Sequence, residues 1–162
     1  MMTVIYRFRP MTAHDLPRLR RWLNTPEVRR WWGDPDEQYA LVRDDLAHPD
    51  MDQFIVGRDD GWFAYLQCYR LGVWNDGFGF HPPATRGIDQ FIGEPALIGR
   101  GHGSAFIRQF VDGQLDSGTP RIVTDPAPDN LRAVRAYEKA GFVKSGLVNT
   151  PDGSALLMVL NP

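Results

Sequence analysis

Three glycines at alternate positions, Gly99, Gly101 and Gly103, form the first group of residues whose spacing suggests chemistry. Glycine lets the backbone turn tightly and approach a ligand closely, because it carries no side chain. The apolar residues that follow recur at helical spacing, so a helix begins here, and its first N–H groups and dipole favour phosphate. The run matches neither the P-loop nor the G-x-G-x-x-G pattern. Alone, it is equally compatible with a tight turn that binds nothing.

Asn130 and Tyr137 form the second group. They are seven residues apart in a segment with helical spacing, so both side chains are expected on one helix face, about two turns apart. Two side chains placed in this way can contact one bound ligand. A purely structural interpretation also stands, in which Asn130 caps the helix and Tyr137 is a core aromatic residue.

Secondary structure must position these residues, and hydrophobic periodicity with turn signals predicts a mixed α+β chain. Three short helices are expected after the first strand, before a β-hairpin. The segment 72–84 is rich in glycine, proline and aromatic residues, so a loop is predicted there. The predicted strands are 4–9, 53–58, 62–71, 85–92, 121–124, 142–149 and 156–160, and the predicted helices begin near residues 16, 26, 39, 104 and 130.

The composition narrows the class of protein. The 162 residues fit one domain, drawn as 1–162, and a net charge of −2 gives no basic field for nucleic acid. The single cysteine, Cys68, excludes an internal disulfide, and the four histidines lack metal-ligand spacing, so no metal is expected. No apolar run is typical of a membrane span or a signal peptide. A cytoplasmic monomer or homodimer without membrane contact is expected.

Taken together, the two groups of residues resemble the acetyl-CoA site of the GNAT acetyltransferases. That superfamily carries [RQ]-x-x-G-x-[GA] at its pyrophosphate loop, which Gly101 and Gly103 match, although Ile98 stands where Arg or Gln is usual. Its downstream pattern N-x-x-A-x-x-x-Y-x-K-x-G-F is matched in full. The matching residues are Asn130, Ala133, Tyr137, Lys139, Gly141 and Phe142.

The resemblance implies a GNAT fold: a bent, mixed and largely antiparallel sheet, splayed in the middle and flanked by helices. It implies acetyl-CoA as cosubstrate, with its pyrophosphate on the backbone amides of residues 99–104 and Tyr137 as proton donor to the departing thiolate. Backbone N–H groups of the central strand would polarise the thioester carbonyl. The cofactor-binding residues expected on this basis are Gln90, Phe91, Ile92, Gly99, Arg100, Gly101, His102, Gly103, Ser104, Asn130, Ala133 and Tyr137.

Further motifs are similar to those of the aminoglycoside 6'-N-acetyltransferases, which are antibiotic-resistance enzymes, and this resemblance covers nearly the whole chain. The motifs are Trp-Trp-Gly at 31–33, Arg-Gly-Ile-Asp-Gln at 86–90, Thr-Asp-Pro at 124–126 and Thr-Pro-Asp-Gly at 150–153. By this resemblance Asp89 is the candidate base and Asp76 binds acceptor amines. The implied catalytic pair is Asp89 and Tyr137, and the implied acceptor-binding residues are Trp31, Trp32, Asp76, Asp89 and Asp125.

One departure and two alternatives stand beside this interpretation. The family members carry a run of acids after the loop at Asp76, where this chain has Phe-Gly-Phe-His-Pro-Pro at 78–83, and fewer negative charges attract a polycation less. A siderophore-type hydroxylamine acyltransferase is one alternative, but its pattern places a histidine where Asp89 stands. A catalytically silent acyl-CoA-binding regulatory domain is the other, in which Asp89 is a hydrogen-bonded structural residue. The sequence favours a primary amine of a cationic small molecule, first an aminoglycoside 6'-amine, as the acetyl acceptor.

Overall fold

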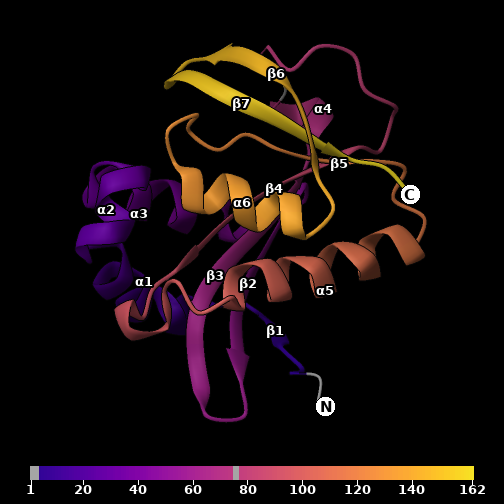
Figure 1. The fold of residues 1–162 in the computed structure, drawn as a ribbon. Helices are drawn as coiled ribbons and strands as arrows, with labels where there is room; N and C mark the ends of the chain where they lie inside the picture. Colours follow the sequence, from indigo (N-terminus) through magenta and orange to yellow (C-terminus); the bar gives the residue numbers. More distant parts are fainter. Residues whose placement is uncertain (1–3, 75–76) are drawn as a thin grey trace. The chain divides into compact units, whose positions relative to one another are not determined.

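The computed structural model describes residues 4–74 and 77–162, so Asp76 lies outside the described residues. Figure 1 shows its helices and strands. The chain forms two compact units. Unit 1 comprises residues 1–67 and 90–98, and unit 2 comprises residues 68–89 and 99–162. Strands β3 and β4 each contribute residues to both units.

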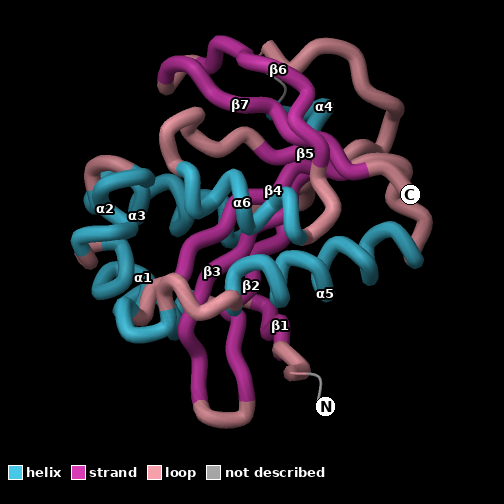
Figure 2. The backbone as a smooth tube through the Cα atoms, viewed as in Figure 1, coloured by secondary structure: helices cyan, strands magenta, loops and turns pink. Residues whose placement is uncertain are grey.

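Strands among the described residues follow the order β1-β2-β3-β4-β5-β7-β6 in one sheet (Figure 2). β4 and β5 are parallel, whereas β1 and β2, β5 and β7, and β6 and β7 pair antiparallel. The predicted mixed α+β fold is therefore confirmed. The strand bounds are β1 Arg7–Pro10, β2 Met51–Arg58, β3 Gly61–Arg70, β4 Arg86–Ile92, β5 Ile122–Thr124, β6 Val143–Thr150 and β7 Gly153–Leu160.

The helices depart from the predictions at two places. The third helix begins at Pro35 rather than near residue 39, because Asp34 caps it by accepting a hydrogen bond from the Glu37 N–H at 2.9 Å. The predicted loop at 72–84 begins with one helical turn, α4, whose buried Leu71 anchors it after β3. The helix bounds are α1 Leu16–Leu23, α2 Pro26–Trp32, α3 Pro35–Asp44, α4 Leu71–Trp74, α5 His102–Asp116 and α6 Leu131–Lys139, with 3-10 turns at Ala13–Asp15, Asp45–Ala47 and Pro95–Leu97.

Unit 1 packs helices α1 to α3 around an aromatic and aliphatic core. Trp22, which has no exposed surface, packs edge-on against Phe91 with ring centroids 6.2 Å apart. Tyr65 and Phe91 lie with their ring centroids 5.4 Å apart in the same cluster. The short amphipathic helix α1 thus contributes a buried indole to the core beside β4.

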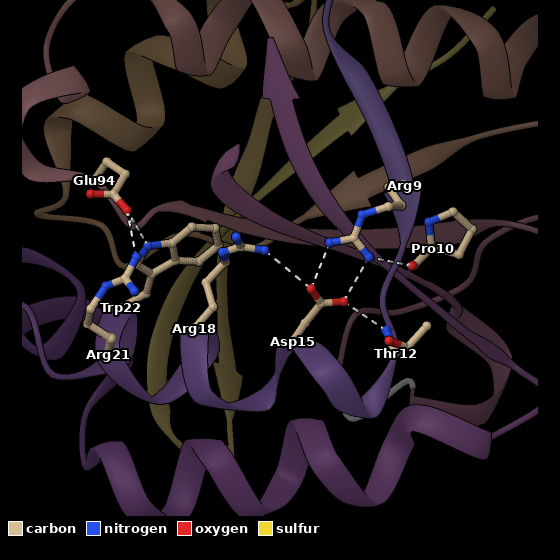
Figure 3. A network of polar contacts seen from close by, with 8 residues as sticks. All are labelled: Arg9, Pro10, Thr12, Asp15, Arg18, Arg21, Trp22 and Glu94. Carbon is tan, nitrogen blue, oxygen red and sulfur yellow. Dashed lines mark hydrogen bonds and ion pairs between the residues drawn. The ribbon is translucent and has the colours of Figure 1, made fainter. Parts of the chain in front are cut away.

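A buried carboxylate, Asp15, links the start of α1 to β1 (Figure 3). Asp15 is only 4% exposed and accepts hydrogen bonds from the Arg9 guanidinium at 2.7 and 3.0 Å and from the Thr12 N–H at 3.0 Å. Arg18 lies 3.3 Å away. Burial raises the pKa of Asp15, but these hydrogen bonds and charges outweigh it and hold the pKa below its ordinary value. Thr12 and Asp15 thus form a capping box at the start of the 3-10 turn Ala13–Asp15.

Unit 2 holds the splayed pair of parallel strands. β4 and β5 pair only at their starts, where Arg86 lies opposite Ile122 and Gly87 opposite Val123. The next contact between them comes from a side chain, since the Thr124 hydroxyl donates to the Ile88 carbonyl at 2.9 Å. Helices α5 and α6 pack on each other, and Arg108 Nη1 of α5 donates to the Lys139 carbonyl at 3.4 Å. Within the two described ranges, no helix combines the length and apolar character that crossing a membrane requires.

Candidate active site

Three carboxyl groups gather in unit 2. Asp89 lies on β4, Asp125 directly follows β5, and Asp152 lies in the turn between β6 and β7. The hydrogen bond between Thr124 and the Ile88 carbonyl aligns the two strands immediately before Asp89 and Asp125. Burial is the main cause that raises the pKa of Asp125 to about 8, followed by the charge of Asp89, a side-chain hydrogen bond with Asp89 and the charge of Asp152. At neutral pH Asp125 is therefore mostly protonated, and it is hydrogen-bonded to Asp89.

Tyr69 is the residue that connects these acids to the predicted proton donor. It lies on β3, only 7% exposed, and packs edge-on against Trp74 with ring centroids 5.7 Å apart. Burial and then the charges of Asp89 and Asp125, with a further contribution from Tyr137, raise the pKa of Tyr69 well above 10. A Cβ on Gly87 would overlap its ring, so that glycine is needed for Tyr69 to lie against β4.

The raised pKa of Asp125 predicts how stability depends on pH. An unfolded Asp titrates near ~3.9, so this group lowers the free energy of unfolding as pH rises from about 4 to about 8. Asp125→Asn mimics the protonated side chain and keeps a donor for Asp89. We expect the free energy of unfolding of the variant to exceed that of the native protein by at least ~1.4 kcal/mol more at pH 9 than at pH 6, the equivalent of one pKa unit.

Thermal and denaturant unfolding at the two pH values measure this difference. Asp129→Asn is the matched control, because Asp129 is exposed and lies in the same segment. Equal pH dependence of Asp125→Asn and the native protein would show that Asp125 is ionised throughout this range.

Helix α6 carries the second predicted group of residues. Tyr137 is buried, packs edge-on against Phe142 with ring centroids 5.5 Å apart, and lies close enough to Tyr69 to affect its charge. Asn130 caps the helix, since its Oδ1 accepts the Ala133 N–H at 3.3 Å. The capping interpretation of Asn130 is thus confirmed, and the amide nitrogen is the atom of that side chain left to serve a ligand.

The glycine loop begins helix α5 as the sequence predicts. Gly101 is the residue before the helix, with φ of 85°, and Gly99 has φ of 77°. A Cβ at either position would meet open space, so the left-handed backbone, not crowding, requires glycine there. The first turn of such a helix presents N–H groups that have no partner within the helix, next to the positive end of its dipole. This arrangement fits a pyrophosphate, and Arg100, His102 and Ser104 lie in the same turn.

Five predicted site residues belong to unit 1. The Phe91 side chain is buried in the core, so only its backbone can serve a ligand, while Gln90 and Ile92 are half-buried. Trp32 is half-buried and lies edge-on to Phe91 with ring centroids 5.0 Å apart. The Trp31 indole N–H donates to Glu27 at 3.2 Å. Contacts within unit 1 thus account for part of the surface of both tryptophans, and each indole is partly exposed.

The structure groups some of the predicted residues and adds two that the sequence did not single out. Asp89, Asp125 and Tyr137 come together in unit 2, and Tyr69 and Asp152 join them. Asp152 stands in the Thr-Pro-Asp-Gly turn, whose family pattern is a signal for it. Tyr69 gives no signal, because it is one of several aromatic residues in an apolar strand. Over residues 4–74 and 77–162, no group of three or more His, Cys, Asp and Glu side chains has the arrangement of a metal site.

Comparison with known proteins places this geometry in a family. The acetyltransferase (GNAT) domain family matches residues 11–150. The chain is 38% identical over 163 residues to an aminoglycoside N(6')-acetyltransferase type 1 of Klebsiella pneumoniae, covering 93% of this chain and 80% of the relative. It is 47% identical over 78 residues to a kanamycin resistance protein of Rhizobium radiobacter, covering 48% of this chain and 72% of the relative.

A solved structure extends the comparison to three dimensions. The aminoglycoside acetyltransferase AAC(6')-Ib in complex with coenzyme A and kanamycin superposes with a TM-score of 0.83 at 36% identity, covering 97% of this chain and 95% of that one. The GNAT fold predicted from the sequence is confirmed. The chain belongs to the GNAT acetyltransferases, with aminoglycoside N(6')-acetyltransferases as its relatives.

Proposed function

We propose that this protein transfers the acetyl group of acetyl-CoA to a primary amine of a cationic small molecule, first among them an aminoglycoside 6'-amine. The observation that carries the acceptor class is the carboxyl pair of Asp89 and Asp125, with Asp152 nearby. A half-buried carboxyl pair is less well solvated than an exposed one and repels itself when both members ionise, so a cation is the ligand it favours. The names of the relatives agree with this acceptor.

The reaction follows from positioning and proton transfer. Asp89 holds the acceptor ammonium and accepts its proton, so that the neutral nitrogen can attack the thioester carbon. The second carboxyl, Asp125, is a hydrogen-bond partner of Asp89. Tyr137 donates a proton to the departing thiolate and is reprotonated by the second proton that the attacking nitrogen loses, while Asp89 releases its proton to solvent. The backbone amides of the glycine loop hold the pyrophosphate. Holding the two reactants together removes most of the entropic part of the barrier.

Three further expectations complete the proposal. Both units act as one acetyltransferase domain, because the family match runs through both of them. The protein works in the cytoplasm, where acetyl-CoA is made and from which that polyanion does not cross a membrane unaided. A monomer or homodimer suffices, since the residues assigned to acetyl transfer lie on one chain. Lowered kanamycin susceptibility of cells that express the protein is the expected biological consequence.

The function is tested by free-thiol release from acetyl-CoA with kanamycin, spermidine, a hydroxylamine and no acceptor. Turnover with kanamycin, and product acetylated at the 6'-amine by NMR, is expected. Turnover of the hydroxylamine alone would assign a siderophore-type acyltransferase. CoA binding without turnover of any acceptor would assign a regulatory domain.

The phosphate assignment of the glycine loop predicts a selective loss of CoA binding. Gly103 lies in the first turn of α5, where a valine would cover the N–H groups that face the pyrophosphate. Gly103→Val should raise the Kd of CoA at least tenfold, or about 1.4 kcal/mol, in calorimetric titrations. Gly113→Val places the same side chain later in the same helix, where a Cβ meets open space, and should bind CoA like the native protein. Equal affinity of the two variants would remove the phosphate assignment.

A further inference from the structure

Helix α1 is fastened to the chain just after β4 by a side-chain contact (Figure 3). The indole N–H of Trp22 donates to Glu94 Oε1 at 2.9 Å, and Arg21 Nη2 lies 3.0 Å from the same oxygen. Trp22 is fully buried in the core of unit 1, so its indole is a fixed donor. The hydrogen bond from Trp22 is the first cause that holds the pKa of Glu94 below its ordinary value. The contact is therefore a charge-assisted one at neutral pH.

The backbone beside Glu94 is held with it. The N–H groups of Gly93 and Glu94 both donate to the Phe63 carbonyl of β3, at 2.7 and 3.3 Å. A Cβ on Gly93 would overlap the Trp22 ring, so this backbone lies directly against the indole. The edge-on contact of Phe91 with the same indole adds a second point of attachment. Trp22 thus holds β4 from both sides of Ile92.

We propose that Trp22 and Glu94 form a latch that positions the Gln90–Ile92 backbone for the thioester of acetyl-CoA. The inference rests on the proposed function, because it assumes that N–H groups of this backbone polarise the thioester carbonyl. Neither Trp22 nor Glu94 touches the reacting atoms in this assignment. Both are positioning residues that act through the strand.

A ligand-binding strand needs such an anchor for a physical reason. A backbone N–H aimed at a ligand is unavailable to a neighbouring strand, so the ladder that normally holds the strand is interrupted. β4 lies between β3 and β5 in the sheet, and its ladder with β5 pairs only Arg86 and Gly87. The latch lies two residues beyond Ile92 and adds a buried indole and a carboxylate to the contacts that hold this end of β4. Misplacement of a carbonyl-polarising group by about 1 Å costs ~10²-fold in rate.

Three variants test the latch. Glu94→Leu removes the acceptor of the indole hydrogen bond, Trp22→Phe removes its donor while it keeps an aromatic ring in the core, and Glu94→Gln keeps an acceptor oxygen. The readouts are hydrogen–deuterium exchange of residues 90–93, the Kd of CoA by calorimetry, and kcat with KM for each substrate. Glu94→Leu and Trp22→Phe should speed hydrogen–deuterium exchange of residues 90–93, raise the Kd of CoA about fivefold and lower kcat about tenfold. Glu94→Gln should stay within about threefold of the native protein, and KM of the acceptor should not change in any of them.

Asp15→Asn is the matched control, because it loosens the other end of α1 without touching β4 (Figure 3). It should lower the melting temperature as much as Glu94→Leu does, yet leave exchange of 90–93, CoA affinity and kcat unchanged. The latch would be overturned if variants of Glu94 and Trp22 behaved like Asp15→Asn, with a lower melting temperature but unchanged exchange, CoA affinity and kcat. Native protein that binds no CoA and acetylates no acceptor would instead refute the proposed function. If Glu94→Leu does not fold, Trp22→Phe decides by the same readouts.

Discussion

Asp89→Asn should lower kcat/KM for an amino sugar or polyamine by roughly 2–4 kcal/mol, about 30-fold to 10³-fold. Asn has nearly the size and hydrogen-bonding capacity of Asp, but it carries no charge for the ammonium and accepts no proton from it. The Kd of acetyl-CoA should stay unchanged, because the glycine loop and α6 are untouched. Steady-state kinetics with kanamycin and calorimetric titration with CoA measure the two quantities.

The neighbouring acid makes this prediction sharper. Asp125 is mostly protonated at neutral pH, first because it is buried and then because of the charge of Asp89. In Asp89→Asn only the second cause disappears, so the pKa of Asp125 falls and its ionised fraction replaces part of the charge that binds the ammonium. We therefore expect the loss to appear mainly in kcat, which reports proton transfer, and less in KM of the acceptor.

Two comparisons separate a specific loss from a general one. Asp116→Asn removes an exposed acid from the end of α5 in the same unit, and should leave kcat/KM within a factor of two. Raised salt should weaken acceptor binding to the native protein more than to Asp89→Asn, since screening acts on the charge that the variant lacks. A hydroxylamine is neutral and needs no carboxylate, so Asp89→Asn should lower kcat/KM for an acceptor of that class only slightly. Loss of hydroxylamine turnover equal to that of kanamycin would contradict the assigned role of Asp89.

Local sequence signals predicted the parts of the site that depend on local geometry. Gly101 stands where the chain needs a left-handed residue before α5, and Asn130 stands where α6 needs a cap. Each requirement is set within one turn of the chain, so residue type and spacing reveal it.

Features that depend on distant neighbours could not be predicted in the same way. Tyr69 looks like any core aromatic residue, and only the approach of Asp89, Asp125 and Gly87 makes it part of the site. The Phe91 side chain faces the core, which the sequence of β4 does not reveal, because Asp89 and Gln90 interrupt the alternation of its apolar residues. The one-turn helix α4 was predicted as loop since glycine and proline dominate the segment that follows Leu71.

Tyr137→Phe should lower kcat by about 10²-fold while the Kd of acetyl-CoA changes little. The ring keeps its edge-on contact with Phe142, so the variant removes one hydroxyl and no packing. A CoA thiolate is a stable anion only above its pKa, and a positioned donor lets it depart as the thiol at neutral pH. Single-turnover rates of acetyl transfer measure the chemical step without product release.

Tyr69 supplies the competing hydroxyl, because it lies near Tyr137, and burial and then the charges of Asp89 and Asp125 raise its pKa. Tyr69→Phe should raise KM of the acceptor and leave the single-turnover rate at saturation within about threefold, since its hydroxyl faces Asp89 and Asp125 rather than the thioester in the proposed reaction. A 10²-fold loss confined to Tyr69→Phe would assign the proton donor to Tyr69. If neither variant slows acetyl transfer more than twofold, both tyrosines serve packing, and the thiolate takes its proton from solvent.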